Sequence, residues 1–294
     1  MILKSKNPKL KLGILCLFVV ALLSVHCRAD GSKILATGGV TQVEGAAGGG
    51  LVPWAVIAGY AQEGETGFTL AKSKLNTDDF VFDVSGFAMG VNNRFEFSYA
   101  KQRLELGPLQ AALSLPVNEL KQEVFGVKAK LFGDLIYDAS PQFSFGAQYK
   151  KLDDFTIPEI AGAAESDGID YYLSASKFWL EGLSGYPLLM NLTLRSSNAN
   201  QLGLMGFGGD LNNSRELLWE FNSSVFITRN WVVGYEFRQK PNNLSFAKED
   251  HWQDIYLAWF YDQSIASVLS YVDLGSVAGL EEQQGLYLSL QASF

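Results

Sequence analysis

The sequence has few of the residues on which metal and redox chemistry depend. Its 294 residues include two cysteines and two histidines. Both cysteines and one histidine lie within the first 29 residues, so His251 is the only histidine in the rest of the chain. This scarcity excludes a disulfide framework there and argues against a zinc or similar metal centre. We therefore expect no metal and no cofactor.

Charged residues are also scarce, and acidic ones predominate. They make up 18% of the chain, with 23 basic against 31 acidic residues, whereas roughly 25% is typical of soluble domains. Nucleic acids call for a basic surface, so an acidic chain argues against them as partners. The apolar content of 48%, with 29 glycines and 20 phenylalanines, excludes extensive disorder and is compatible with a membrane protein.

One long apolar run occurs at the N-terminus. Four lysines precede the 14-residue stretch Leu12–Val25, which is shorter than the ~20 residues of a membrane-spanning helix. Small residues at Cys27 and Ala29 then predict a signal peptide over residues 1–29, cut after Ala29. Lipidation of Cys27 is the competing interpretation, disfavoured because no small residue directly precedes it. The segment carries five basic residues and no acidic one, which leaves 18 basic against 31 acidic residues, a formal charge of −13.

Beyond residue 29 the dominant hydrophobic period is two. Phe143, Phe145 and Tyr149, for example, alternate with Gln148 and Lys150. The same alternation recurs over residues 95–100, 217–225, 231–238 and 255–261. The longest later apolar run, residues 51–61, is too short to span a bilayer as a helix and contains a proline. The pattern predicts β-strands with an apolar face and a small or polar face.

Short and long connections alternate between these strands, which favours a membrane barrel over a secreted sandwich. Tight turns are predicted near residues 92–93, 138–141, 183–185, 228–230 and 262–264, and longer connections near 105–120, 153–168, 198–213, 241–250 and 275–283. Sandwich strands usually run about 5–6 residues, whereas these run about ten, the length that crosses a bilayer at a tilt. We predict an all-β fold, an antiparallel transmembrane β-barrel forming one domain after the signal peptide.

The strand count depends on the glycine-rich segment that follows the signal peptide. Twelve strands are predicted near residues 67–75, 79–91, 94–104, 121–136, 142–152, 168–180, 186–197, 214–227, 230–240, 251–262, 264–274 and 284–294. Residues 33–43 and 53–62 would raise the count to 14 if they joined the wall. The predicted organisation is a signal peptide (1–29), a glycine-rich segment that supplies two strands or a lumen plug (30–62), and the barrel (63–294).

The C-terminus carries a strong local pattern. Alternate apolar residues end on a terminal aromatic residue and lie on one strand face: Leu286, Leu288, Leu290, Ala292 and Phe294. This pattern resembles the terminal β-signal of bacterial outer-membrane proteins. The resemblance implies recognition by the barrel-assembly machinery during insertion, with the apolar face turned to outer-membrane lipid.

Two further segments resemble a known family. Residues 33–60, which run from KILATGG to VIAGY, and residues 94–103, RFEFSYAKQR, are similar to a family of proteobacterial outer-membrane proteins catalogued as a domain of unknown function. The similarity covers residues 31–294. It implies a barrel in the outer membrane of a Gram-negative bacterium, and it implies no activity and no functional residues.

Charged residues on the polar strand faces are the candidate site. Facing the lumen, they would either pair with one another or set the ion selectivity of a pore. These lumen candidates are Asp83, Glu96, Lys128, Lys130, Lys150, Arg195, Glu220, Glu236 and Arg238. His251, with Ser245 nearby, is a weak hydrolase candidate, because no nucleophile motif accompanies it.

The function expected from the sequence is that of a passive channel or uptake conduit for a small solute, and we predict no enzyme. The alternative is a non-conducting barrel with a structural or surface-interaction role. An outer-membrane hydrolase using His251 comes third. The expected partners are lipid, the assembly machinery and the solute.

Overall fold

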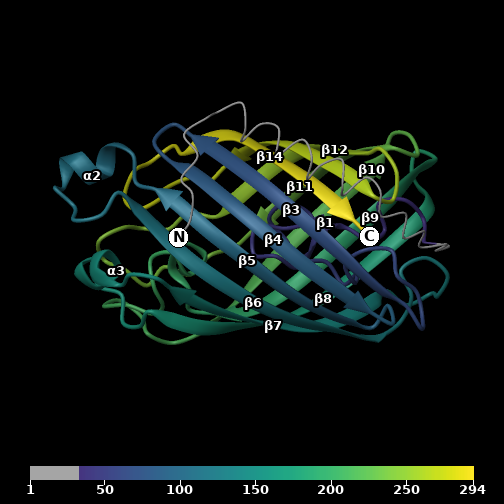
Figure 1. Cartoon of the computed structure of the whole chain (residues 1–294), viewed down its shortest axis with the longest axis horizontal. Coiled ribbons are helices and arrows are strands. Elements are labelled where there is room, and N and C mark those ends of the chain that lie inside the picture. The colour runs from purple at the N-terminus through teal and green to yellow at the C-terminus, as the bar shows by residue number, and fades with distance from the viewer. Residues whose placement is uncertain (1–32) are drawn as a thin grey trace, which may run out of the picture.

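The structure, a computed structural model, describes residues 33–294. The predicted signal peptide lies outside the described residues. Twelve antiparallel strands form a closed barrel (Figure 1). They are β3 (Thr66–Thr77), β4 (Val81–Val91), β5 (Phe95–Glu105), β6 (Glu119–Phe132), β7 (Gln142–Leu152), β8 (Asp167–Leu183), β9 (Tyr186–Ser197), β10 (Glu216–Phe226), β11 (Trp231–Arg238), β12 (Trp252–Phe260), β13 (Ile265–Asp273) and β14 (Gln284–Ser293). No helix within residues 33–294 is long and apolar enough to cross a membrane.

The wall has 12 strands, so the alternative of 14 is wrong. Each strand pairs with its sequence neighbour, and β14 closes the barrel on β3. The short strands β1 (Val40–Thr41) and β2 (Ala47–Gly48) pair with each other in a separate sheet. A wall strand needs alternate side chains for lipid and lumen, whereas residues 36–61 are buried without alternation.

Strand faces follow the predicted alternation. On β5, Phe95 and Phe97 point outward and are 45% and 47% exposed, whereas Glu96 between them is buried. On β14, the leucines of the predicted assembly signal are exposed and Tyr287 and Ser289 are buried. A barrel whose outer surface is apolar suits a bilayer, because lipid tails solvate such side chains. Recognition of β14 by the assembly machinery stays a prediction.

The two ends of the barrel differ in their connections. At one end, the turn end, two-residue turns such as Asn92–Asn93, with φ of 54° and 47°, join strands in the left-handed conformation that tight hairpins require. The connection of residues 133–141 is longer than predicted, because β6 ends at Phe132. At the other end, the loop end, longer connections contain α2 (Pro108–Ala112), α3 (Thr156–Ile160) and η1 (Asn200–Gly203), and Figure 1 shows α2 and α3 together there.

The barrel is filled rather than hollow. Residues 33–62, termed the lumen segment, run within the ring of strands, where Figure 1 shows β1 behind the front wall. Val52, Ala55 and Glu44 in this segment have no exposed surface. Chain that precedes β3 therefore occupies the space that an open pore would leave to water.

Candidate functional site: the filled lumen

Polar side chains of the wall hold the backbone of the lumen segment. The carbonyl oxygen of Pro53 accepts hydrogen bonds from Ser174, Asn191 and Thr193 at 3.3, 3.2 and 2.9 Å. These three side chains come from β8 and β9 and are buried. Other wall side chains bonded to this backbone are Gln102, Gln142, Ser176 and Gln291. The small polar face predicted for the lumen thus binds protein backbone.

Glu96 and Lys128 form a clamp that binds the lumen segment at two places, at Ala47 and at residues 56–58. They are register partners on β5 and β6, with 3.1 Å between ammonium and carboxylate. Lys128 donates to the carbonyl oxygens of Ala47 and Val56 at 2.9 and 2.8 Å. Glu96 accepts from the N–H groups of Ala47 and Ala58 at 3.1 and 2.8 Å. One buried ion pair therefore binds four backbone groups of the lumen segment, and the Ala47 carbonyl oxygen accepts a further hydrogen bond from the N–H of Trp54.

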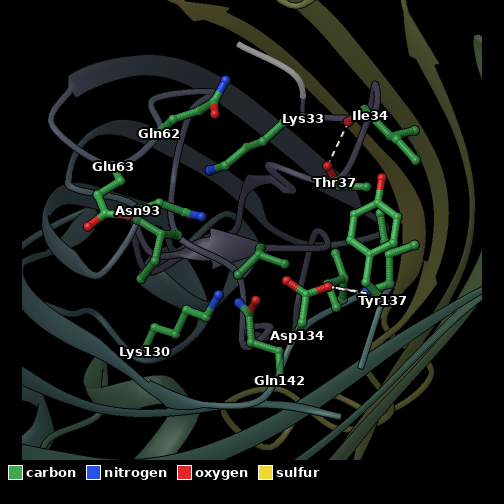
Figure 2. Close-up of a pocket in the computed structure, with 14 residues that line it drawn as sticks. Lys33, Ile34, Thr37, Gln62, Glu63, Asn93, Lys130, Asp134, Tyr137 and Gln142 are labelled. Atoms are coloured by element: carbon green, nitrogen blue, oxygen red, sulfur yellow. Dashed lines mark hydrogen bonds between the residues drawn. The ribbon is translucent and has the colours of Figure 1, made fainter. Parts of the chain in front are cut away.

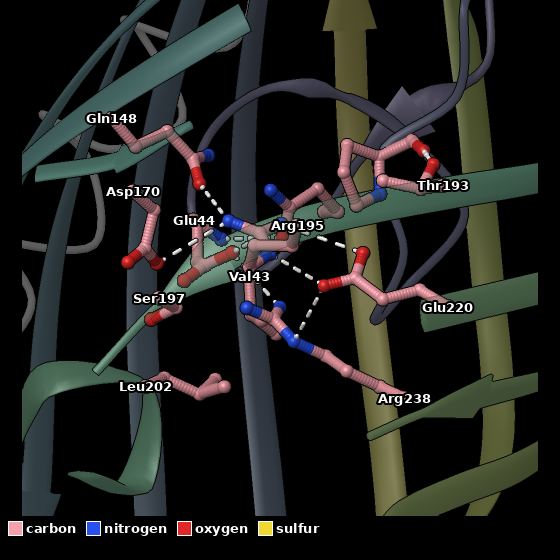
Figure 3. Close-up of polar contacts among 12 residues, drawn as sticks. Val43, Glu44, Gln148, Asp170, Thr193, Arg195, Ser197, Leu202, Glu220 and Arg238 are labelled. Atoms are coloured by element: carbon pink, nitrogen blue, oxygen red, sulfur yellow. Dashed lines mark hydrogen bonds and ion pairs between the residues drawn. The ribbon is translucent and has the colours of Figure 1, made fainter. Parts of the chain in front are cut away.

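Glu44 is the centre of a larger buried ion cluster. Its carboxylate forms ion pairs with Lys150 of β7, with Arg195 of β9 at 3.5 Å and with Arg238 of β11 at 2.8 Å. Figure 3 shows Glu44 between side chains that reach in from different strands. All four side chains are nearly or fully buried.

Two wall carboxylates balance the charge of this cluster. Asp170 of β8 lies 2.6 Å from Lys150, and Glu220 of β10 lies 2.5 Å from Arg195 and 3.3 Å from Arg238. With Glu44 there are three acids and three bases, so the Glu44 cluster is electrically neutral. A buried charge left without its partner is costly, so the cluster favours retention of Glu44 in the lumen.

Position 49 of the lumen segment requires glycine, because the backbone there lies very close to a side chain of β11. The carboxylate of Glu236 accepts from the N–H of Leu51 at 2.7 Å. A Cβ at Gly49 would lie 2.0 Å from the same carboxylate, so no larger residue fits without movement. The register partner of Glu236, Asp254, accepts from Ser270 at 2.5 Å. Glycines in this segment therefore let its backbone approach the wall closely.

The loop end is closed by a second element, termed the cap (residues 198–208). Gln201 and Leu202 take left-handed φ values of 45° and 62°, which turns the chain back into the barrel. The carbonyl oxygen of Leu202 accepts from Lys150 at 3.1 Å, and the N–H of Gln201 donates to Glu249 at 2.9 Å. Lys240 pairs with Glu249 at 3.2 Å, while burial raises the pKa of Glu249 and lowers that of Lys240. Lys150 thus contacts both the cap and the lumen segment.

At the turn end a vestibule of about 260 Å³ remains open. Figure 2 shows Lys33 and Lys130 extending their ammonium groups toward the same space, with Asp134 on another side. Burial, and then the charge of Lys130, lower the pKa of Lys33 to about 8. The Lys33 ammonium also donates to the carbonyl oxygen of Gly59 at 3.1 Å, which anchors the start of the lumen segment.

The structure brings most of the lumen candidates together. Seven are buried in the lumen: Glu96, Lys128, Lys150, Arg195, Glu220, Glu236 and Arg238. Lys130 lines the vestibule. The placement of Asp83 in the lumen is wrong, because its carboxylate lies on the outer face, 3.0 Å from Arg103. Near the loop end, apolar residues such as Phe82 point inward against the cap, and charged residues point outward.

Six buried charged residues were not among the candidates: Glu44, Asp170, Lys177, Lys240, Glu249 and Asp254. Asp170 could have been found from alternation, because it lies between the outward-facing Ile169 and Tyr171. Glu44 could also have been identified from the sequence, since it is the only charged residue between Lys33 and Glu63. A lone charge in a glycine-rich apolar segment needs a partner if the segment is buried.

His251 and Ser245 do not form a nucleophile–base pair in the described part of the chain. The Ser245 hydroxyl is bonded to Asp210. Nδ1 of His251 accepts from the backbone N–H of Lys240 at 3.4 Å, and its ring packs against Phe237 with 5.4 Å between centroids. Residues 33–294 contain no group of three or more His, Cys, Asp or Glu that could hold a metal ion.

Solved structures similar to this chain include porins. The KdgM porin, solved alone and in complex with a disordered oligogalacturonate, matches with a TM-score of 0.50 and 10% identity over 77% of this chain and 99% of that one. The NanC porin matches with a TM-score of 0.47, 10% identity and coverage of 77% and 98%. Outer membrane phospholipase A from Escherichia coli matches with a TM-score of 0.40, 8% identity and coverage of 79% and 91%.

Comparison with curated protein sequences gives no significant match. A family model described as "Protein of unknown function (DUF3034)" matches residues 37–291. This match confirms the resemblance to a family of unknown function, and it includes residues 94–103 and the N-terminal segment from residue 37 onward. The chain, a porin-like antiparallel β-barrel, belongs to the DUF3034 family.

Proposed function

We propose that this protein is a gated outer-membrane conduit for a small polar solute, closed when the lumen segment and the cap occupy the barrel. The observation that carries the proposal is the way in which the wall binds the segment. Ser174, Asn191 and Thr193 donate to backbone of the lumen segment. If the segment moved, these groups would line a polar passage able to exchange hydrogen bonds with a solute.

The attachments of the lumen segment suit a removable element. Side chains of the wall hold it, and no backbone hydrogen bond joins residues 33–61 to a wall strand in the described chain. Side-chain contacts can be exchanged for water one by one, whereas a paired strand would have to be stripped from the sheet. The segment can therefore move while the 12 strands keep their pairing.

Location and export form part of the proposal. Exposed leucines on β14 and phenylalanines on β5 supply the apolar surface that lipid requires. The signal peptide predicted over residues 1–29 would deliver the chain across the inner membrane. Flotation of the heat-modifiable protein with outer-membrane fractions is the expected result. Recovery in the soluble periplasm would contradict this location.

A disulfide between the lumen segment and the wall tests gating. A Cβ at Gly86 of β4 would lie 3.0 Å from Cγ2 of Thr41, so Thr41→Cys and Gly86→Cys place two thiols within bonding reach. Residues 30–294 contain no native cysteine, which leaves the engineered pair alone. In planar bilayers the oxidised protein should stay closed, and reduction should restore voltage-induced unitary openings. Thr41→Cys alone should open under both conditions.

The second candidate is a non-conducting structural barrel, and the Glu44 cluster favours it. Release of Glu44 would separate buried charges, which typically costs about 3–5 kcal/mol when one partner is removed. The same recordings decide between the two functions. Openings that are insensitive to the disulfide would refute gating by the lumen segment. Absence of unitary conductance both in the reduced protein and in a folded variant lacking residues 33–61 would establish the structural role.

A further inference from the structure

Basic residues gather on one part of the outer surface. Toward the loop end, β3 to β7 carry six outward-facing basic side chains: Lys72, Lys74, Lys101, Arg103, Lys121 and Lys151. On β8 to β14 the only outward-facing base is Lys177, near the turn end, where its ammonium is bound by the carbonyl oxygens of Ile136 and Asp138. The outward-facing bases that belong to strands near the loop end therefore lie on β3 to β7. Arg215, just before β10, is also exposed at that end, where it binds Ser196 and stacks over Tyr171.

Strand register places three of these lysines around a small residue. Lys72 pairs with Ser85 across β3 and β4, and Ser85 pairs with Lys101 across β4 and β5. Lys74 lies on the same face of β3, two residues further along. Neighbouring strands are about 4.8 Å apart, so Lys72 and Lys101 flank Ser85 about 10 Å from each other. We call Lys72, Lys74, Ser85 and Lys101 the basic patch.

The positive charge of the basic patch is poorly neutralised by the protein. Within the described chain, Lys72 and Lys74 have no carboxylate within 4.0 Å, and the Lys72 ammonium donates to Ser85 at 3.1 Å. Asp83, the register partner of Lys74, is bound instead by Arg103. Lys101 has one distant partner, Glu123, at 3.9 Å. The neighbouring Arg103 differs, since it contacts three carboxylates at 2.5 to 3.1 Å. The three lysines therefore remain available to an anion.

The patch borders the apolar belt. Two residues closer to the turn end on each strand, the register aligns four outward-facing apolar or aromatic side chains. They are Leu70, Phe87, Tyr99 and Phe125. Two residues along a strand span about 7 Å, so the ammonium groups lie just beyond the side chains that suit lipid tails. On β14 the register partners of Lys72 and Lys74 are the exposed Leu290 and Leu288. The lysines therefore lie at the border of the apolar surface, where Lys and Arg favour anionic lipid headgroups.

We propose that the basic patch binds the phosphorylated headgroup of a lipid in the leaflet at the loop end, whose acyl chains lie along the aromatic row. The inference rests on the membrane location in the proposed function and is independent of gating. A headgroup phosphate between Lys72 and Lys101 would accept hydrogen bonds from both ammonium groups and from the Ser85 hydroxyl. Because the outward-facing bases of the strands near the loop end lie on β3 to β7, we expect the phosphorylated lipid to bind at this patch and not equally around the whole barrel.

Native mass spectrometry of the refolded protein, released from phosphatidylcholine nanodiscs that contain diphosphoryl lipid A, tests the site. The wild-type protein should retain lipid A, and Lys72→Gln/Lys101→Gln should weaken retention roughly fivefold for each lysine removed. Ser85→Glu, which adds a carboxylate between the lysines, should have a similar effect. The control Arg229→Gln/Lys248→Gln removes two exposed charges elsewhere and should retain lipid A as the wild type does.

Two results would overturn the proposal. One is equal retention by the wild-type and the Lys72/Lys101 variant, each shown to be folded by its heat-modifiable mobility. The other is equal retention of lipid A from which the phosphates have been removed, which would make the contact purely apolar. Conductance recorded on the same samples keeps a failure of gating separate, because lipid retention does not require an open lumen.

Discussion

The Glu44 carboxylate of the lumen segment lies 2.8 Å from the Arg238 guanidinium of β11. The same carboxylate pairs with Lys150 of β7, which is four strands away around the wall. A single acidic side chain therefore ties two separated parts of the barrel to the chain inside it. We therefore expect a substitution of Glu44 to weaken the attachment of the lumen segment to the wall.

Glu44→Gln should destabilise the closed barrel. The amide keeps the shape of the side chain but leaves three buried bases facing two acids, Asp170 and Glu220. We expect a loss of about 3–5 kcal/mol in the free energy of unfolding, measured with guanidinium in lipid vesicles. Glu63→Gln, at an exposed position, should change it by less than about 0.5 kcal/mol. Equal stability of the two variants would contradict the role given to Glu44.

Gly49→Ala should displace the lumen segment, whereas Gly50→Ala should be tolerated. A Cβ at Gly49 would lie 2.0 Å from Glu236, but at Gly50 the nearest atom is a Tyr287 carbon at 3.4 Å, an ordinary contact. Overpacking of this kind typically costs about 1–3 kcal/mol. The measurement is the unfolding free energy together with protease sensitivity of residues 41–52. Similar results for the two alanines would show that Glu236 moves aside freely.

Lys150→Met should loosen the lumen segment and the cap together. The Lys150 ammonium contacts Glu44, Asp170 and the Leu202 carbonyl, so its loss removes a bond to each element. Hydrogen exchange should accelerate both in residues 41–50 and in residues 198–208. Lys151→Met is the matched control, because that neighbouring side chain points outward and is exposed. Faster exchange in only one of the two segments would show that they open independently.

The Lys33 ammonium should titrate near pH 8. Its folded pKa of about 8 lies below the ordinary value of 10.5 because of burial and then of Lys130. The folded state thus favours the neutral amine. The cost of the charged form is fully present below pH 8, is relieved as the pH rises toward 10.5, and is constant above that. Competitive amine labelling should report this pKa, and Lys130→Gln should raise it. A pKa near 10.5 in both proteins would contradict this desolvation of the Lys33 ammonium.

Alternation predicted much of the wall because the bilayer constrains it. Tyr149 faces outward, and this assigns Lys150 to the lumen and Lys151 to the surface without further information. The same rule placed Asp83 incorrectly, since near the loop end the outer surface no longer contacts lipid tails and tolerates charge. Periodicity therefore predicts side-chain direction reliably only within the depth of the hydrocarbon.

The lumen segment could not be placed from its own sequence. Its glycines and small apolar residues give no period of two, so wall strands and plug remained open alternatives. Its conformation depends on distant partners, as with Glu44 and Lys150, which are separated by 106 positions. The clamp of Glu96 and Lys128 was identifiable as a charged pair in the lumen, but its backbone partners at Ala47 and Val56 were not.

The seam between β3 and β14 has a consequence for the order of assembly. The lumen segment directly precedes β3, and the N–H of Thr41 donates to Gln291 of β14 at 2.7 Å. While β14 is still unpaired with β3, the sheet is open along its side, and the segment can be enfolded laterally. Pairing of β14 with β3 would then enclose the lumen segment, which is synthesised before all the strands of the wall. The lumen segment would thus enter the barrel during folding, and it would not have to pass through the open end of a barrel that had already closed.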